Sequence, residues 1–462
     1  MTSTTTTTAP AATTTTTTTT VSSDPPLQGR VDTLTDDQTK MLKQIWRQLL
    51  VLFKQKGEPW TPPSPINDPT TTTKKNRDDD TIKKSSNDEH GFETNLFIGK
   101  TSNPAWTSLG VEEAMPLIPG HLLHMTFWNM VTGDNPDCVV LRYLRARKWD
   151  VDAAYTMLLN TLRWRIYMRV DDVSALGETG MVRVLEELKP GMGEQFYYNV
   201  HSNKTVLGGP DNAGRGICFV NARFHRKEDQ DLEVIKLLTV YVMELSRMIV
   251  HQPVEAACIV FNMEGFTLAN MDFEFTKFLL HCFESYYPET LGSCLIHKVP
   301  WVFSTVWTMI TPLLDPVVAS KIRFTKTLNE LSQHVSTAVL PPFLTGKETI
   351  KVDKGVEASL QRTPPPEGTL KRPMTPEVLD YNTMIEEYQY QTSLWAAQST
   401  TKASDPERKQ LALMYRHATI NAELYLRGRT SYHEMGLAGV ERGRLLLKYL
   451  GKVPTLDITD SV

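Results

Sequence analysis

Short apolar runs alternate with helix-like apolar stripes between residues 215 and 325, and this alternation constrains the fold more than any other feature. The expected strands are Gly216–Val220, Ala256–Met263, Cys294–Lys298 and Lys321–Thr325. Between the first two, apolar residues recur every three or four positions, at Ile235, Leu238, Val242, Leu245 and Ile249. Alternating strands and helices predict a mainly parallel sheet covered by helices, the α/β class.

No common catalytic or nucleotide-binding motif accompanies this pattern. The sequence has no GxGxxG after a strand, no Walker loop, no GxSxG and no HExxH. We therefore expect neither an enzyme nor a metal site. The five cysteines form no CxxC pair and are odd in number, so they are interpreted as small buried hydrophobic residues in a reducing compartment. A formal net charge of -4 gives no support to nucleic-acid binding.

A run without charged residues extends from Val299 to Leu314, between Lys298 and Asp315. It is shorter than the ~20 apolar residues of a membrane span, and it contains Pro300 and Pro312. As a helix it would carry one polar stripe and an otherwise apolar surface. Two interpretations are open on this pattern: a core helix, or a movable lid over an apolar cavity.

Composition divides the chain into eight segments. We expect a disordered Thr-rich tail (1–34), an amphipathic helix (35–56), a linker (57–107), an N-terminal helical module (108–170), an α/β lobe (171–346), a second linker (347–373), a helical C-terminal extension (374–451) and a short tail (452–462). The run RLLLKYL before Gly451 is interpreted as the last helix. The 35–56 helix has one apolar face, which either docks on the body or lies in a membrane interface.

The turn after residue 141 is unusually basic, with Arg142, Arg145, Arg147 and Lys148 close together. It is either a solvated corner or an anion-binding site.

Several of these stretches resemble one family. LRYLRARKWD (141–150) and LRWR (162–165) resemble the N-terminal module of the CRAL-TRIO lipid-binding family. SYYPETLG (285–292), the uncharged run with its continuation to Ile322, and LPPFLTGK (340–347) resemble its lipid-binding lobe, in the family's order. Within the family, the chain looks most like the longer fungal secretory-type phosphatidylinositol transfer proteins.

The resemblance implies a helical module packed on an α/β lobe that encloses a hydrophobic cavity. It implies that the uncharged helix is a gate that opens at a membrane, with the gate residues Trp301, Phe303, Val306, Trp307, Ile310, Leu313 and Leu314. It also implies a phosphoinositol site, in which Arg147 and Lys321 match the phosphate-binding residues and Glu289 matches the inositol-binding carboxylate. Cations at a buried phosphodiester would offset its desolvation.

The sequence departs from the family at several ligand positions. Thr290 and Val318 replace a basic residue and a phosphate-binding Thr. Ala257, Ile259 and Cys218 replace the Ser, Thr and Tyr of the choline-headgroup site, which removes hydroxyl donors. We expect poor phosphatidylcholine binding and a second, more apolar ligand such as a sterol precursor or polyisoprenoid. The expected wall of its cavity comprises Cys218, Ala257, Ile259 and Phe261.

The functional hypothesis is a non-enzymatic protein that binds phosphatidylinositol in a gated cavity and exchanges it at membrane surfaces. It requires no cofactor besides the bound lipid, and we expect a monomer without nucleic-acid partners. Two alternatives stay open: a carrier or sensor of a neutral hydrophobic ligand with a vestigial phosphoinositide site, and a lipid-loaded interaction scaffold. The N-terminus lacks the basic and apolar regions of a signal peptide. We expect a cytoplasmic protein that associates peripherally with the endoplasmic reticulum, Golgi, endosomes or lipid droplets.

Overall fold

A computed structural model describes residues 28–58, 103, 105–345, 372–399, 405–449 and 453–462. Most of the expected Thr-rich tail and of the two expected linkers lies outside these residues. The expectation of a structureless segment is wrong at two borders. Leu34 is buried within the tail's last residues, and Trp106 is buried in a short helix at the end of the first linker.

The confirmed α/β architecture centres on a five-stranded sheet in the order β1–β2–β3–β4–β5. Its strands are β1 (Thr205–Gly208), β2 (Ile217–Asn221), β3 (Ala257–Asn262), β4 (Leu291–His297) and β5 (Ile322–Thr325). The strands from β2 to β5 are parallel, as the alternation predicted, whereas β1 is an antiparallel edge strand that the sequence analysis did not identify.

Alternate residues of the central strands serve two separate cores. On β3, Ile259 faces the larger core beneath the lobe helices, while Cys258 and Val260 face a smaller core with Leu331 and Val335. Both faces of the sheet are covered, as is usual for parallel strands. The helices of the lobe are α9 (Leu232–Ser246), α10 (Phe273–His281), α11 (Phe303–Ile310), α12 (Pro316–Ser320), α13 (Leu328–Ser332) and α14 (Pro342–Thr345).

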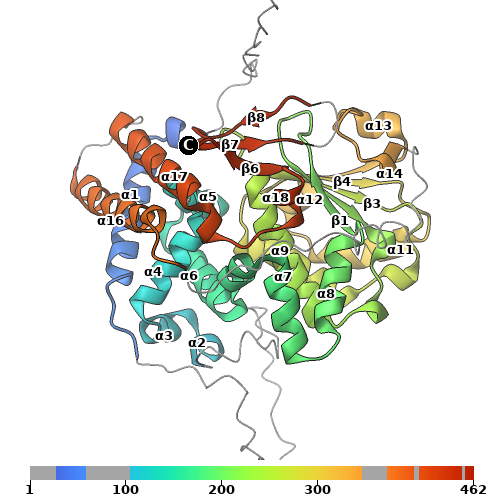
Figure 1. Cartoon of the computed structure of the whole chain (residues 1–462), viewed down its shortest axis with the longest axis horizontal. Helices are drawn as coiled ribbons and strands as arrows, with labels where there is room; N and C mark the ends of the chain where they lie inside the picture. Colours follow the sequence, from blue (N-terminus) through green and yellow to red (C-terminus); the bar gives the residue numbers. More distant parts are fainter. Residues whose placement is uncertain (1–27, 59–102, 104, 346–371, 400–404, 450–452) are drawn as a thin grey trace, which may run out of the picture.

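A helical module lies beside the sheet (Figure 1). It contains α2 (Ala105–Ser108), α3 (Val111–Ala114), α4 (Gly120–Val131), α5 (Pro136–Ala146), α6 (Val151–Met168), α7 (Val170–Leu188) and α8 (Met192–His201). Asn135 and Asp150 cap the two central helices, since their side chains accept hydrogen bonds from Asp137 N and Ala153 N. The Asp150 cap lies at the turn that carries the basic residues, where α6 begins.

The amphipathic helix α1 (Asp36–Leu52) packs on the body rather than presenting its apolar face to a membrane. Ile45 and Trp46 are fully buried, and Trp46 Nε1 donates to Asp137 Oδ1 over 2.7 Å. The same carboxylate binds the Arg408 guanidinium, whose nitrogens lie 2.7 and 2.8 Å from its oxygens. The structure therefore joins α1 to the C-terminal extension through one buried group.

The C-terminal extension is only partly helical, so the expectation of helix up to Gly451 was wrong. It contains α16 (Pro376–Ala397), α17 (Pro406–Leu426), α18 (Ser431–Glu434) and a small antiparallel sheet of β6 (Ala438–Glu441), β7 (Arg444–Leu447) and β8 (Leu456–Asp457). The first residues of the run RLLLKYL form β7 and not a helix. Arg442 and Gly443, both with positive φ, make a two-residue hairpin turn directly before them.

Candidate functional site

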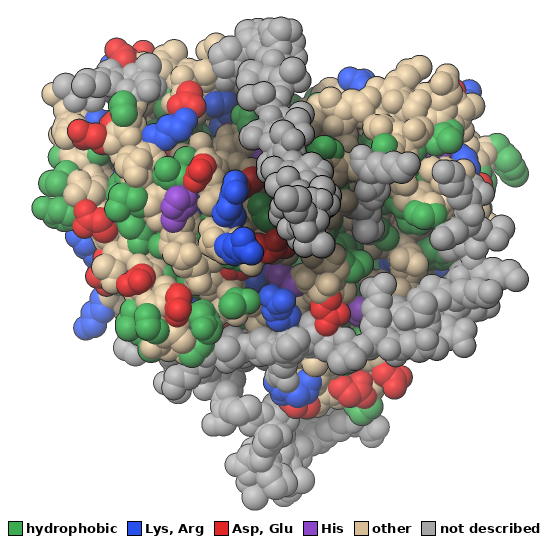
Figure 2. Space-filling view, turned by 45° about the horizontal axis from the view of Figure 1, so that its top comes forward, with side chains coloured by type: hydrophobic (Ala, Val, Ile, Leu, Met, Phe, Trp, Pro, Cys, Tyr) green, Lys and Arg blue, Asp and Glu red, His purple; other side chains and the backbone are tan. Residues whose placement is uncertain are grey.

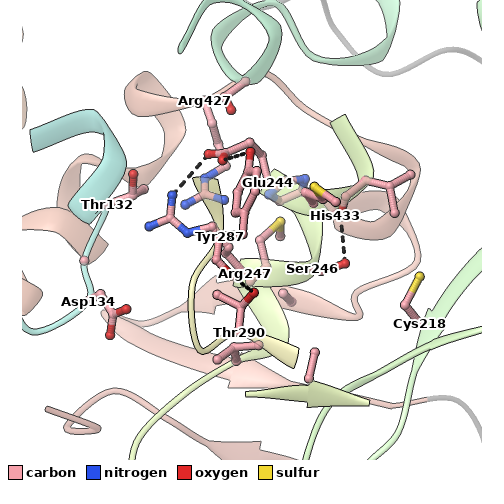
Figure 3. Close-up of a pocket in the computed structure, with 18 of the residues that line it drawn as sticks. Thr132, Asp134, Cys218, Glu244, Ser246, Arg247, Tyr287, Thr290, Arg427 and His433 are labelled. Carbon is pink, nitrogen blue, oxygen red and sulfur yellow. Dashed lines mark hydrogen bonds and ion pairs between the residues drawn. The ribbon is translucent and has the colours of Figure 1, made fainter. Parts of the chain in front are cut away.

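A cavity of about 530 Å³ lies between the larger-core face of the sheet, α9 and the C-terminal extension. Its volume falls within the ~300–1,000 Å³ of pockets that hold small-molecule ligands. The cavity has an apolar part along the sheet and a polar part around the last turn of α9. Figure 3 shows this division: Glu244, Tyr287 and Arg247 lie close together, and Cys218 lies apart from them.

The four residues expected to form the cavity wall all line this cavity. Cys218 comes from β2, and Ala257, Ile259 and Phe261 come from β3, where every second side chain points to the same face. Ile235, Leu238 and Val242 of α9 face them across the cavity. Burial raises the pKa of Cys218 to about 12, so its thiol stays neutral and acts as an apolar surface.

The polar part is organised around one buried carboxylate, Glu244. The Arg165 guanidinium donates to both of its oxygens, over 2.9 and 3.2 Å, and Arg247 Nη1 donates over 3.1 Å. Tyr287 OH donates over 2.8 Å. Burial alone would raise the pKa of Glu244, but the charges of Arg165 and Arg247 outweigh it and hold the pKa at about 2. The carboxylate is therefore ionised whenever the protein is folded near neutral pH.

Of the expected phosphoinositol residues, the structure brings Glu289 and Lys321 to one edge of the sheet. Glu289 shortly precedes β4, and Lys321 directly precedes β5. Arg147 is exposed at the end of α5. Within the described part of the chain, no hydrogen bond or ion pair joins these three side chains to one another, and none of the three lines the cavity.

Arg145, rather than Arg147, has the side chain that approaches Glu289. Arg145 Nε lies 3.8 Å from Glu289 Oε2, and Arg145 Nη2 donates to Glu255 Oε2 over 2.9 Å. Arg30 and Arg142 also face Glu255. Burial would raise the pKa of Glu255, but these three guanidiniums together lower it. Sequence reasoning missed Glu255, because only the packing of α5 shows which arginines turn inward.

The expected gate residues occupy α11 and the turns on either side of it, and none of them lines the cavity. Phe303 and Val306 are buried in the larger core, while Trp307, Ile310, Leu313 and Leu314 are half-buried. Trp301 is 89% exposed. None of the described helices is long and apolar enough to cross a membrane. One face of the helix therefore packs on the lobe, and Trp301 just before the helix is exposed to solvent.

The C-terminal extension contributes a wall of the cavity that sequence reasoning did not anticipate. Its lining residues include Arg427, His433 and Ala438, together with Leu445 of β7 and Ile458 near the chain's end. Figure 2 shows Lys and Arg side chains beside a recess in this face of the molecule. No sequence signal identified these positions, because the extension carries no motif of the lobe.

Comparison with known proteins places the site in a family. The CRAL/TRIO domain matches residues 200–346, and the CRAL/TRIO N-terminal domain matches residues 105–160. The crystal structure of Sfh5 covers 49% of this chain and 80% of that chain, at 16% identity and a TM-score of 0.37, a similarity too low to support a conclusion.

Relatives match well beyond these two domains. CRAL-TRIO domain-containing protein C3H8.02 of Schizosaccharomyces pombe is 30% identical over 94% of this chain and 97% of its own length. Phosphatidylinositol transfer protein CSR1 of Eremothecium gossypii is 34% identical over 70% of this chain and 78% of its own length. Phosphatidylinositol transfer protein PDR17 of Saccharomyces cerevisiae is 26% identical over 40% of this chain and 51% of its own length. The chain therefore belongs to the CRAL-TRIO family of lipid-binding proteins.

Proposed function

We propose that this protein transfers phosphatidylinositol between membranes without catalysing a reaction. The observation that carries the proposal is the cavity, whose apolar part suits hydrocarbon chains and whose polar part lies around the last turn of α9. Relatives named as phosphatidylinositol transfer proteins support the choice of lipid. The bound lipid is the only small molecule that the proposal requires.

The headgroup would lie at the edge of the sheet where β4 and β5 begin. Lys321 supplies a cation there, and Arg145 and Arg147 lie on the last turn of α5 and just beyond it. Glu289 would accept hydrogen bonds from inositol hydroxyls, because a carboxylate repels phosphate but binds hydroxyl groups. The inward position of Arg145 makes it an additional headgroup ligand in this proposal.

The gate helix would meet the membrane through its outer surface. Trp301, Met309, Val317 and Phe324 are exposed apolar side chains in and around the helix. Two Thr hydroxyls donate to the helix's own backbone: Thr308 Oγ1 to Ser304 O over 3.0 Å and Thr311 Oγ1 to Trp307 O over 2.7 Å. Hydroxyls satisfied in this way cost little to move out of water. A peripheral, transient association of a cytoplasmic monomer with intracellular membranes follows from this proposal.

The experiment is transfer of fluorescent phosphatidylinositol from donor to acceptor vesicles by the purified full-length protein. We expect transfer well above the protein-free rate, and a loss of about tenfold or more in the Arg147→Ala/Lys321→Ala double variant, since each charge-assisted hydrogen bond contributes roughly 1.5–3 kcal/mol. Wild-type transfer at the protein-free rate would reject the proposal. Transfer unaffected by the double variant would reject the headgroup assignment.

A second candidate function is the carriage of a neutral hydrophobic ligand. The observation that favours it is the hydroxyl-free wall of Cys218, Ala257, Ile259 and Phe261. Native mass spectrometry of the protein purified from its own host separates the two functions. Phosphatidylinositol as the main bound species supports transfer, whereas a sterol precursor or polyisoprenoid as the main species supports the carrier.

A further inference from the structure

The cavity is positively charged, although the whole chain carries a net charge of -4. Among the described residues that line it, eight are Lys or Arg and five are Asp or Glu, an excess of three positive charges. Most of the lining carboxylates pair with lining arginines. Arg142 Nη2 lies 2.7 Å from Asp134 Oδ2, and Arg427 Nε lies 2.8 Å from Glu423 Oε1. The excess must therefore be sought among cations that have no carboxylate partner.

Four lining cations pair with no carboxylate in the described part of the chain: Lys204, Arg372, Arg416 and Arg429. Lys204 is buried and donates to the amide oxygens of Asn199 and Gln230. Arg416 is buried and donates to three backbone carbonyls, which leaves Arg372 and Arg429.

Arg372 Nη2 donates to the neutral amide oxygen of Asn129 over 2.6 Å. The Arg429 guanidinium makes no hydrogen bond or ion pair with any residue that the structure describes. Both side chains are half-buried. A half-buried guanidinium without a counter-charge has lost part of its hydration and gained little in return.

Arg372 and Arg429 both lie beside α7. The amide that Arg372 binds, Asn129, donates in turn to Asp171 Oδ2 of α7 over 3.1 Å, and Glu178 N of the same helix donates to Arg429 O over 3.4 Å. Burial raises the pKa of Tyr381, and the charges of both Arg372 and Arg427 oppose that rise. Tyr381 itself lines the cavity.

The backbone that carries Arg429 is held in place by close contact with α7. A Cβ atom on Gly428 would lie 2.4 Å from Gly177 N, so only glycine allows the two segments to approach this closely. Gly428 N donates to Ser174 O over 2.9 Å, and both the backbone and the hydroxyl of Ser431 donate to Glu178 Oε1 over 2.9 Å. The backbone position of Arg429 is therefore fixed by these contacts and does not depend on a bound ligand.

We propose that Arg372 and Arg429 bind the phosphate group of an amphipathic ligand whose hydrocarbon part lies against α9 and β3. Guanidinium groups bind phosphate in paired, charge-assisted hydrogen bonds, and an apolar wall beyond them favours an attached lipid chain. The ligand class is an anionic phosphate-bearing lipid, such as phosphatidic acid or a polyisoprenyl phosphate. The site is separate from Arg147, Glu289 and Lys321, none of which lines the cavity.

This inference rests on the lipid-carrying cavity of the proposed function and names a ligand for its polar end. It also refines the expectation of a more apolar second ligand. The wall along the sheet is indeed apolar, but the cavity as a whole is not neutral. A wholly neutral ligand would leave both arginines without a counter-charge.

The test measures uptake of fluorescent phosphatidic acid from phosphatidylcholine vesicles by the full-length protein. The variants are Arg372→Gln, Arg429→Gln and the double variant, and Arg183→Gln is the matched control. Arg183 is an exposed arginine of α7 that pairs with Glu187 and does not line the cavity. We expect each single variant to bind phosphatidic acid about tenfold or more weakly, the double variant more weakly still, and the control to match wild type.

Charge-conserving variants guard against a folding defect. Arg372→Lys and Arg429→Lys should retain much of the binding that the Gln variants lose, at melting temperatures equal to wild type. Competition by glycerol 3-phosphate assigns the site to the phosphate group alone, and lack of competition assigns it to an intact lipid. Either result is consistent with a phosphate site.

Absence of phosphatidic acid uptake by wild type, or equal uptake by wild type and the double variant, overturns the inference. The outcome is independent of the phosphatidylinositol assay. Uptake that depends on Arg372 and Arg429 stands even if phosphatidylinositol is not transferred. Conversely, the double variant could transfer phosphatidylinositol normally and take up as much phosphatidic acid as wild type. That result would reject this site and leave the proposed function intact.

Discussion

Trp164 and Tyr286 stack face to face, with ring centroids 4.2 Å apart and 8° between their planes. Trp164 belongs to the LRWR motif of α6, and Tyr286 belongs to the SYYPETLG motif that follows α10. The next residues, Arg165 and Tyr287, both bind Glu244. These two motifs therefore join the helical module to the lobe, which explains part of their sequence in structural terms.

Replacing Trp164 should destabilise the protein strongly. Trp164→Ala removes a fully buried ring and its stacking contact with Tyr286. We expect the free energy of unfolding to fall by about 3–5 kcal/mol. Chemical denaturation followed by circular dichroism measures it. Trp301→Ala is the control, since an exposed side chain should change stability by no more than about 0.5 kcal/mol. Similar losses in both variants would contradict the assignment of Trp164 to the junction.

Glu244 should make stability depend on acid pH. Its pKa is lowered from 4.5 to about 2 in the folded protein, so its stabilisation is complete above about pH 4.5 and is lost as the pH falls toward 2. The shift corresponds to about 3 kcal/mol at neutral pH.

Comparison with Glu244→Gln isolates this contribution from those of other carboxylates. The stability difference between wild type and variant should be largest at pH 7 and should fall to less than half of that value by about pH 3. Denaturant titrations at both pH values measure it. A difference that does not change with pH would show that the charge of Glu244 is not what stabilises the junction.

Trp301 should act in membrane contact and not in folding. Trp301→Glu places a charge on the outer surface of the gate helix, and we expect vesicle-to-vesicle transfer to fall by roughly tenfold with an unchanged melting temperature, because interfacial Trp side chains anchor proteins at membranes. Tyr390→Glu, at an exposed aromatic position of α16, is the matched control. Equal effects of the two variants on transfer would assign the change to net charge alone.

Restoring hydroxyls to the cavity wall should widen ligand choice. The Ala257→Ser/Ile259→Thr variant adds two donors to the cavity-facing side of β3, and we expect it to transfer phosphatidylcholine where wild type does so poorly. Cys258→Ser adds a hydroxyl on the same strand but on the opposite face of the sheet, so it should gain no such transfer. Gain of phosphatidylcholine transfer by the control, or by neither variant, would mean that this wall does not select the headgroup.

The fold could be predicted where a local pattern determines the structure. The strands β2 to β5 are short apolar runs flanked by helical stripes, and all four were located to within a few residues. The edge strand β1 has no comparable run, since Val206 and Leu207 are the only two large apolar residues among its four. The hairpin at Arg442 and Gly443 was missed because a short apolar run fits a helix and a strand equally well.

The cavity wall on β3 was predicted from the resemblance to the family, and alternation along the strand explains why Ala257, Ile259 and Phe261 share one face. The polar part was not predicted, since Arg165, Glu244, Tyr287 and Arg427 come from four distant segments. Spacing near the end of α5 likewise could not distinguish Arg145 from Arg147. Only the packed structure shows that Arg145 turns toward Glu255 and Glu289.

The cavity's wall from the C-terminal extension also sets the order in which the site can be completed. A ribosome makes the sheet and α9 before it makes Arg429, Leu445 and Ile458. Until those residues emerge, the apolar face of β3 lacks part of its cover. The cavity can therefore close on this side only after the extension has been synthesised, and a nascent chain that stalls in the extension would expose apolar residues that the folded protein covers.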